Sequence, residues 1–364
     1  MRIILIFITV CFYTGSCIAQ AHDSLSKSSC LRQELFEDDE ILQICLQGEI
    51  RELFKDRGEN ANYHPIRFSY QRNDSTFHLK IRVKTRGHYR KLRENCFTPP
   101  LLLNFDTIPK HKNSLFYGQN KLKLVTSCKS EQYILREYMV YKLYQFISPY
   151  HFKARLVKLC FEDTKKGKRT KSEYGILLES PKFMAERNKS NLVKTLHVNP
   201  MKTDRELFLK MAVFQFLIGN TDWSIQYLHN IKLIGNLNTT DLIPIPYDFD
   251  MSGIVNTFYA MPAEALQLKS VRERLFRGYC IKNMKEFQPI LEHFIRLKSD
   301  IYNLYQTDLL LDKTYKKNTL KYIDQFYKII TDEKLSQRAF QHPCNPKGTG
   351  NIVIKGLKKH SSQK

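Results

Sequence analysis

The first half of the chain shows short apolar segments, several with the period-two alternation of half-buried strands. Strands are predicted at residues 66–70, 76–84, 101–105, 121–125, 154–161 and 174–179. Asn73 and Asp74 give a turn signal between the first two. Residues 131–147 instead repeat apolar side chains about every 3.6 positions, which predicts a major helix closed by Pro149. Residues 41–50 indicate an earlier helix.

The second half shows a helical pattern interrupted by one hairpin. Residues 203–206 form a capping-box sequence, and the nearly all-apolar helix predicted at 207–218 ends at Gly219. Strands at 229–234 and 242–247 then flank a turn rich in Gly, Asn and Asp. Further helices are predicted at 263–277, 284–305 and 318–330. This half is therefore expected to be mainly helical.

The hairpin gathers polar side chains that are suited to metal and phosphate chemistry. A hairpin brings the start of its first strand beside the end of its second, so Asn230 and Asp248 should be neighbours. Asp222 lies on the loop that leads into the hairpin, and Asp250 follows closely after Asp248. An Asp, an Asn and a second Asp on one hairpin hold metal and ATP in protein-kinase-like folds. The hairpin therefore predicts a metal–nucleotide site.

The first 19 residues are typical of a secretory signal, which predicts export. Arg2 precedes the apolar run 3–12, and a small residue, Ala19, closes the segment. The run is too short to span a bilayer of about 30 Å, and no later segment is apolar for long enough to do so. Residues 14–17 also resemble a lipobox without its usual leucine, which leaves open a lipid on Cys17. The mature chain is therefore expected to be periplasmic, extracellular or lipid-anchored to the cell envelope.

Composition indicates a large core, disulfide chemistry and anionic partners. Apolar residues make up 42% of the 364 residues. Seven of the nine cysteines follow the signal, an odd number whose pairing the sequence does not give. The net charge of +22 favours a nucleotide, a phosphorylated substrate, a membrane surface or an anionic polymer such as a polysaccharide. No nucleic-acid-binding motif accompanies the charge, and the export signal also disfavours nucleic acid as a partner.

Five motifs resemble, in order, those of the spore-coat-protein-H-like (CotH-type) secreted atypical protein kinases. They are KTRGHYRK at 84–91, LREYMVYKLY at 135–144, YGILLES at 174–180, NTD…HNIKL at 220–233 and PYDFDMSG at 246–253. They resemble the family's Arg-Gly turn, its helix with an Arg-Glu pair, its strand ending in Glu, its catalytic-loop Asp with a metal-binding Asn, and its Pro-aromatic-Asp-x-Asp metal segment. Together they cover roughly residues 35–255.

The resemblance implies catalytic and metal-binding roles on the hairpin. Asp222 would orient or deprotonate the acceptor hydroxyl. Asn230, Asp248 and Asp250 would hold Mg²⁺ or Mn²⁺ on ATP. Structural alternatives stay open: Asp222 could cap the turn after Gly219, Asn230 could bond its own backbone, and Asp250 could cap a turn.

The resemblance also implies nucleotide-binding residues in the first half. Glu137 would pair with a phosphate-binding lysine, Lys121 or Lys123, which share one face of a strand. Arg86 and Gly87 would bring backbone amides to phosphate, and Glu179 would lie at a hinge near the adenine. The alternatives are a surface salt bridge for Glu137, a simple turn at Arg86-Gly87, and an ordinary strand-end residue for Glu179.

The chain departs from the kinase pattern at three points. Asn230 follows Asp222 by eight positions, where kinases leave about five, so Gln226 is an alternative metal ligand. The chain has no GxGxxG loop. Residues 101–105, where the family often carries a lysine, contain none.

These observations predict an α+β, bilobal protein-kinase-like fold with an antiparallel-sheet N-lobe, one major helix and a mostly helical C-lobe. The expected organisation is a signal peptide at 1–19, an N-lobe at 20–179, a C-lobe at 180–345 with the catalytic hairpin at 220–253, and a basic tail at 346–364. The expected function is ATP-dependent phosphate transfer to hydroxyls of a secreted or envelope protein. The alternatives are a catalytically inactive pseudokinase and a cell-envelope protein that binds polyanions or polysaccharides.

Overall fold

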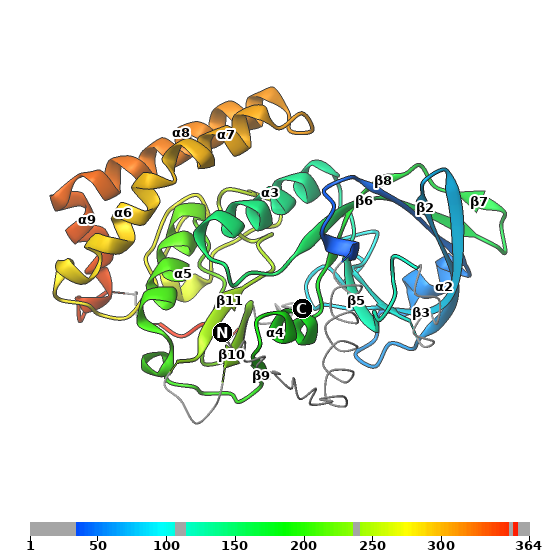
Figure 1. Cartoon of the computed structure of the whole chain (residues 1–364), viewed down its shortest axis with the longest axis horizontal. Coiled ribbons are helices and arrows are strands. Elements are labelled where there is room, and N and C mark those ends of the chain that lie inside the picture. Colours follow the sequence, from blue (N-terminus) through cyan, green and yellow to red (C-terminus); the bar gives the residue numbers. More distant parts are fainter. Residues whose placement is uncertain (1–33, 106–113, 236–240, 349–351, 356–364) are drawn as a thin grey trace, which may run out of the picture.

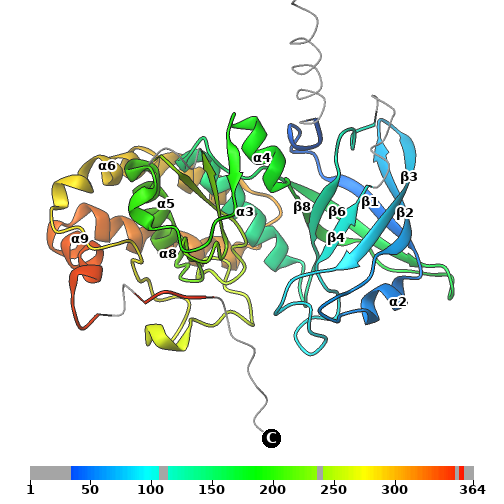
Figure 2. The ribbon, with the colours of Figure 1, turned by 90° about the horizontal axis from the view of Figure 1, so that it is seen from below.

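The computed structural model describes residues 34–105, 114–235, 241–348 and 352–355 (Figures 1 and 2). The predicted signal segment, Cys17 and most of the basic tail lie outside these residues. The first sheet consists of β1 Leu42–Gly48, β2 His64–Arg72, β3 Ser75–Thr85, β4 Leu101–Asn104, β5 Lys121–Val125, β6 Ala154–Asp163, β7 Lys168–Arg169 and β8 Glu173–Leu178. Helix α2 (Ile50–Lys55) follows β1, and α3 (Gln132–Ile147) follows β5.

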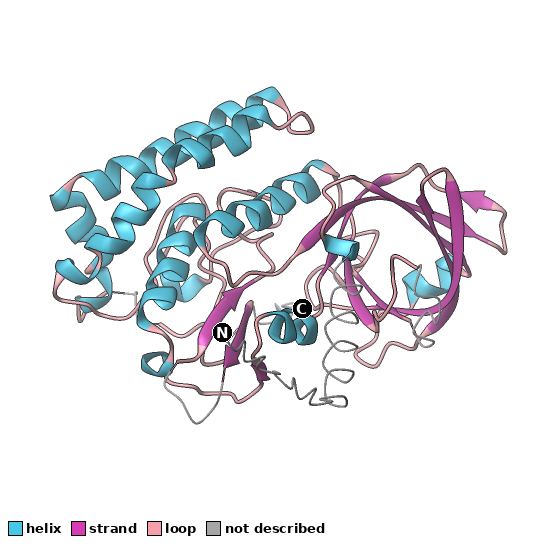
Figure 3. Cartoon of the chain, viewed as in Figure 1, coloured by secondary structure: helices cyan, strands magenta, loops and turns pink. Residues whose placement is uncertain are grey.

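The first sheet closes on itself into a mixed barrel, visible at one end of the molecule in Figure 3. The strand order is β1-β2-β3-β4-β5-β8-β6, and β6 pairs in parallel with β1, from Leu42 opposite Val157 to Gly48 opposite Asp163. The short β7 extends β6 as a hairpin. Closure leaves these barrel strands without an open edge. Aromatic side chains fill the interior, among them Phe68, Phe105 and Phe116.

The predicted fold class is wrong, because this closed barrel does not match the antiparallel sheet of a bilobal kinase-like fold. Residues 42–48 account for the error. Leu42 and Leu46 fit a helical stripe, but in the structure Leu42, Ile44 and Leu46 alternate into the barrel as strand β1. With this segment assigned to a helix, the sheet lacks the strand through which β6 closes it.

The second half combines helices with a second sheet, so the expectation of a mostly helical lobe also needs correction. Strands β9 (Asn191–Val193), β10 (Ile231–Gly235) and β11 (Ile243–Pro246) form this sheet in the order β11-β10-β9. The helices are α4 Pro181–Arg187, α5 Arg205–Ile218, α6 Gln288–Arg296, α7 Lys298–Thr307, α8 Lys313–Thr331 and α9 Glu333–Phe340. The predicted boundary at residues 179 and 180 stays a prediction.

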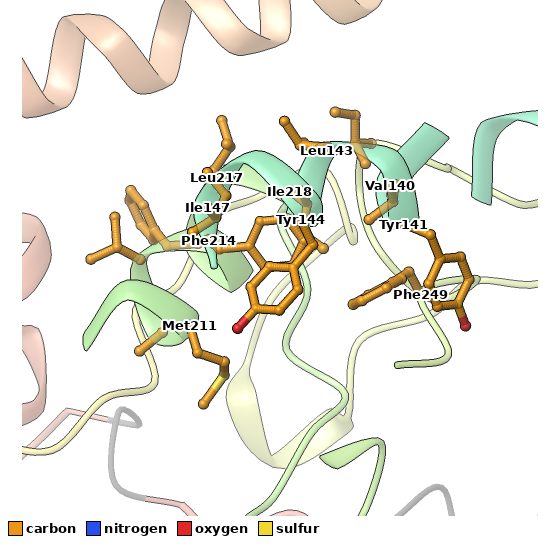
Figure 4. Packing of buried hydrophobic residues seen from close by; sticks show 14 of the residues in the cluster. Val140, Tyr141, Leu143, Tyr144, Ile147, Met211, Phe214, Leu217, Ile218 and Phe249 are labelled. Carbon is orange, nitrogen blue, oxygen red and sulfur yellow. The ribbon is translucent and has the colours of Figure 1, made fainter. Parts of the chain in front are cut away.

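Outside the barrel, a larger hydrophobic core contains helices α3 and α5, which pack against each other (Figure 4). Asp204 caps α5 by accepting a hydrogen bond from the Leu207 amide, and Gly219 ends it with a φ of 66°. Tyr144 of α3 packs on Phe214 of α5, with ring centroids 4.5 Å apart. These helices support the hairpin, since Phe249, directly after it, packs against Phe214.

The predicted helix at 263–277 is wrong. A 3₁₀ turn at Glu264–Leu266 precedes irregular backbone. Arg272, Arg274 and Arg277 from this segment donate hydrogen bonds to backbone carbonyls of other segments. Each guanidinium satisfies carbonyls that lack a partner in regular structure, which helps this segment remain non-helical. The single helix predicted at 284–305 is in fact α6 and α7, which meet at Leu297.

Within the described residues, disulfides join Cys45 to Cys160, Cys96 to Cys128 and Cys280 to Cys344. The first links β1 to β6, the strand pair that closes the barrel. None of the described helices is both long and apolar enough to cross a membrane.

Candidate functional site

The β10–β11 hairpin places Asp248 against the barrel. Ile231 lies opposite Pro246, and one step further the Tyr247 amide donates to the Asn230 carbonyl at 3.0 Å. Asp248 then turns with a φ of 65°, and its amide donates to the hydroxyl of Tyr141 on α3 at 3.0 Å. Its carboxylate Oδ2 lies 2.8 Å from the Lys123 Nζ on β5. The hairpin, α3 and the barrel therefore meet at Asp248.

Cationic side chains converge on this aspartate. Lys123 and Lys232 both approach the ring of Tyr247, with Nζ atoms 5.6 and 5.1 Å from its centroid. Burial lowers the pKa of Lys232, and repulsion from Arg86 and Lys123 adds to the effect. Burial alone would raise the pKa of Asp248, but Lys123, Arg86 and other nearby cations lower it below its usual value. Asp248 is therefore an anion held among positive charges.

A second pair of carboxyls lies deeper, between α3 and the segment after the hairpin. Burial raises the pKa of Glu137 to about 8, and the charges of Asp250 and Asp248 add to the shift. Burial and Asp248 likewise raise the pKa of Asp250 to about 6. The Tyr259 hydroxyl donates to Asp250 Oδ2 at 2.8 Å, and buried Arg90 opposes both shifts. At neutral pH Glu137 therefore holds its proton, while Asp250 is mostly ionised.

Asp222 is fixed by two side chains at the start of the hairpin. His229 Nε2 donates to Asp222 Oδ1 at 2.8 Å. The Asn230 amide nitrogen donates to the Asp222 carbonyl at 2.8 Å and to Oδ2 at 3.0 Å. Burial disfavours the charged imidazole, but the bond and the charge of Asp222 raise the pKa of His229 above 6.5. The carboxylate of Asp222 is thus held in one orientation beside the Asp248 region.

The donor set suits a hard cation. Mg²⁺ and Mn²⁺ prefer oxygen ligands, and Mg²⁺ sites often use one or two carboxylates and take their remaining ligands from phosphate and water. Asp248 and Asp250 would provide carboxylates, and Asn230 would provide its amide oxygen, since its amide nitrogen donates to Asp222. The described residues contain no group of three or more His, Cys, Asp or Glu side chains arranged to hold a metal ion. A metal here stays a prediction.

The other predicted nucleotide-binding residues are spread more widely. Lys123 faces Asp248, whereas Lys121 is exposed at the start of β5. Gly87 has a φ of 89° after Arg86, and a side chain there would meet no atom within 4 Å, so the turn is open. Glu179 forms a buried ion pair with Arg187 at 3.0 Å, and its place near the adenine stays a prediction.

Sequence reasoning missed several members of the site. Arg90 and Lys232 belong to the positive cluster, and Tyr141 and Tyr259 bond to the two aspartates. His229, the first residue of the predicted strand at 229–234, also belongs to the site, because it bonds to Asp222. The sequence carried a signal for this contact, because Asp222 and His229 lie near the two ends of one short loop. A backbone bridge between Ser224 and His229 closes that loop and brings the two side chains together.

Comparisons with known proteins do not place the chain in a family. No family model matches the sequence, and no curated protein matches it. Among solved structures, the fold is similar to the crystal structure of the Helicobacter pylori proinflammatory kinase CtkA, with a TM-score of 0.36 and 11% identity, over 78% of this chain and 95% of that one. A likeness this weak carries no argument, so the function is inferred from the site. The CotH-type resemblance stays a prediction.

Proposed function

We propose that this protein is a metal-dependent phosphotransferase that moves the γ-phosphate of ATP to a hydroxyl group. The convergence of cations on Asp248 carries this proposal. Among the described residues, the ionised carboxylates at this point are those of Asp248 and Asp250. The charges around them are those of four cations, Lys123, Lys232, Arg86 and Arg90. Positive charge exceeds negative charge in a partly buried site, so an anionic ligand would relieve the repulsion. The phosphates of a nucleotide supply such charge.

The chain's own residues divide the work of this reaction. Lys123, Lys232 and Arg86 would bind and orient the phosphates, since phosphoryl transfer depends mainly on positioning and charge neutralisation. Asp248, Asp250 and Asn230 would hold a Mg²⁺ or Mn²⁺ ion, which supplies further neutralisation of the phosphate oxygens when bound. Because Asp248 pairs with Lys123 in this structure, ion binding would have to share or displace that pair.

Asp222 would act on the acceptor. The bonds from His229 and Asn230 hold its carboxylate in place. During transfer, the acceptor oxygen bonds to the γ-phosphorus as the bond from that phosphorus to the β,γ-bridging oxygen breaks. The hydroxyl proton passes to the Asp222 carboxylate, and ADP leaves with the bond's electron pair.

The proposed setting is outside the cytoplasm, with a secreted or envelope protein as the acceptor. Disulfides persist mainly in oxidising compartments, and the pairs Cys45–Cys160, Cys96–Cys128 and Cys280–Cys344 support this location. The signal-like first 19 residues support it as well.

One observation favours a second function on the same scaffold. The proposed metal ligand Asp248 already pairs with Lys123, and the proposed catalytic Asp222 is already bonded to His229 and Asn230. A protein with these contacts and no turnover would be a pseudokinase, or an envelope protein that uses its positive surface to bind polyanions.

The two functions differ in phosphate transfer. The test incubates the mature chain with Mn²⁺ and γ-labelled ATP, and measures transfer to itself and to a general acceptor protein. Asp222→Asn should reduce transfer by about 100-fold or more, within the range of general-base effects, and leave ATP binding intact. Asp74→Asn is the matched control, because Asp74 is an exposed residue of the β2–β3 turn of the barrel, with a positive φ of 58°, and takes no part in the proposed site. Absence of transfer by the parent chain, in the presence of bound nucleotide, would support the pseudokinase instead.

A further inference from the structure

Arg277 donates hydrogen bonds to three backbone carbonyls, two in the loop of the proposed catalytic aspartate and one in the segment 352–355. Its guanidinium Nη1 donates to the carbonyl of Thr221 and, at 2.8 Å, to the carbonyl of Trp223. These residues lie directly on either side of Asp222. Its Nη2 donates to the Ile352 carbonyl at 2.6 Å. Burial lowers the pKa of Arg277 to about 10, against the charge of Asp222, so the group is cationic at neutral pH.

Apolar packing is incomplete on one side of the loop that carries Asp222. A cavity of about 80 Å³ lies there, lined in part by Trp223, Gln226 and Arg277. The amide of Asp222 is bonded on the other side, where it donates to Asn220 Oδ1 at 3.1 Å. Since this solvent-accessible pocket offers the loop few packing contacts on that side, the paired bonds from Arg277 restrain the Thr221–Asp222 and Trp223–Ser224 peptide groups, which bracket Asp222 and Trp223.

The segment 352–355 holds Arg277 in turn. Ile354 is buried in a small cluster with Leu266 and Leu275. Beyond it, Lys355 approaches the ring of Tyr227, with its Nζ 5.4 Å from the centroid. Tyr227 belongs to the same loop as Asp222, so this segment contacts the loop both through Arg277 and directly.

We propose that Arg277 is a positioning residue for Asp222, and that docking of residues 352–355 completes the support of the catalytic loop. Arg277 acts through the backbone, by fixing the peptide group before Asp222 and the peptide group after Trp223. The inference rests on the proposed function, because it assigns Asp222 the task of orienting the acceptor. A lysine cannot replace the arginine, since a compact ammonium cannot reach three carbonyls that the planar, forked guanidinium reaches at once.

The test compares Arg277→Lys with Arg155→Lys in the full mature chain. Arg155 is the matched control, since its buried guanidinium also donates to two backbone carbonyls, those of Leu35 at 3.0 Å and Glu40 at 3.2 Å, but does so beside strand β6 of the barrel. Arg277→Lys should lower the kcat for phosphate transfer by about 10- to 100-fold, the scale of a small misplacement of a catalytic group. The KM for Mn²⁺–ATP should stay within about twofold, because the proposed phosphate-binding residues lie elsewhere. Arg155→Lys should change neither value.

Hydrogen exchange gives a readout that does not depend on turnover. In Arg277→Lys, peptides covering 221–230 and 352–355 should exchange faster, while peptides from α5 keep the parent rate. Ile354→Asp, which would undock the segment from its apolar cluster, should reproduce the faster exchange at 221–230. Unchanged exchange at 221–230 in both variants would overturn the inference. If the parent shows no transfer, the proposed function fails, and the exchange experiment still decides the structural role of Arg277.

Discussion

Replacement of Glu137 by glutamine should make the protein more stable at neutral and alkaline pH. The side chain is 1% exposed on α3, and burial raises its pKa from 4.5 to about 8. The folded state therefore keeps a proton that the unfolded state releases. Since the unfolded state binds fewer protons through this window, the free energy of unfolding falls as the pH rises from 4.5 to about 8.

The size of this effect follows from the two pKa values. They differ by about 3.5 units, and each unit corresponds to about 1.4 kcal/mol, so ionisation of Glu137 would remove up to about 5 kcal/mol. The full stability is present below pH 4.5 and is progressively lost above it. Glutamine keeps the shape of the neutral acid and cannot ionise, so the variant should lack this loss.

The assay is urea unfolding of the parent and of Glu137→Gln at several values between about pH 5 and pH 8. The variant's advantage should grow with pH and reach several kcal/mol at the upper end. Glu94→Gln removes a carboxyl of the same type at an exposed position and serves as the control. Parallel pH profiles for the parent and Glu137→Gln would refute the reasoning, because Glu137 would then not be a buried, proton-retaining acid.

Three further predictions concern Gly219 at the end of α5, the disulfide of the barrel and the bond between Asp222 and His229. Gly219→Ala should destabilise the protein by about 2 kcal/mol or more in thermal or urea unfolding, because the residue has a φ of 66° and no room for a side chain. Loss of the Cys45–Cys160 disulfide, which spans 115 residues, should cost up to about 5 kcal/mol by chain entropy, measured with a double alanine variant under oxidising conditions. The pKa of His229, followed by NMR, should lie above 6.5 in the parent and fall in Asp222→Asn; its contribution to stability is present below pH 6.5 and is lost as pH rises through the raised value. An unchanged His229 titration in that variant would contradict the assigned bond.

Local sequence signals correctly predicted helix α5, which precedes the hairpin, and strand β5, which supplies Lys123. The capping sequence and Gly219 set the limits of α5, and the alternation of Lys121 and Lys123 with buried leucines set β5. The turn at Asn73-Asp74 also forms as expected, with φ values of 47° and 58°. Each of these depends on neighbours within a few residues, which is why periodicity and turn chemistry were sufficient.

The errors arose where distant segments decide the structure. The parallel pairing of β1 with β6 joins residues more than a hundred positions apart, and a single strand carries no local mark of that partner. Periodicity alone also cannot distinguish a short apolar strand from a helix, as residues 42–48 show. In the irregular segment 263–277, the apolar residues are spaced as in a helix. Its arginines Arg274 and Arg277 instead bond to carbonyls that only the tertiary structure brings near.

The same limit applies to the site. The proximity of Asn230 and Asp248 could be predicted from the hairpin alone. The contact between Lys123 and Asp248 could not, because it depends on how the barrel packs against that hairpin. Lys232 lies in strand β10, and the residues next to it in the sequence do not indicate that it belongs to a binding site. Its position beside Tyr247 and Lys123 becomes visible when the two sheets are placed together.

Binding of Mn²⁺–ATP at Asp248 is the most direct test of the proposed function. Thermal unfolding of the mature chain would be measured with and without Mn²⁺–ATP, beside Asp248→Asn and the control Asp74→Asn. Asn tolerates the positive φ of 65° and 58° at these positions, so both variants keep the backbone. At about 100 times the Kd, the ligand should add about 2.7 kcal/mol to the parent and to Asp74→Asn, and little to Asp248→Asn. An equal shift in all three proteins, or no shift in the parent with any nucleotide and metal, would contradict a nucleotide site at Asp248.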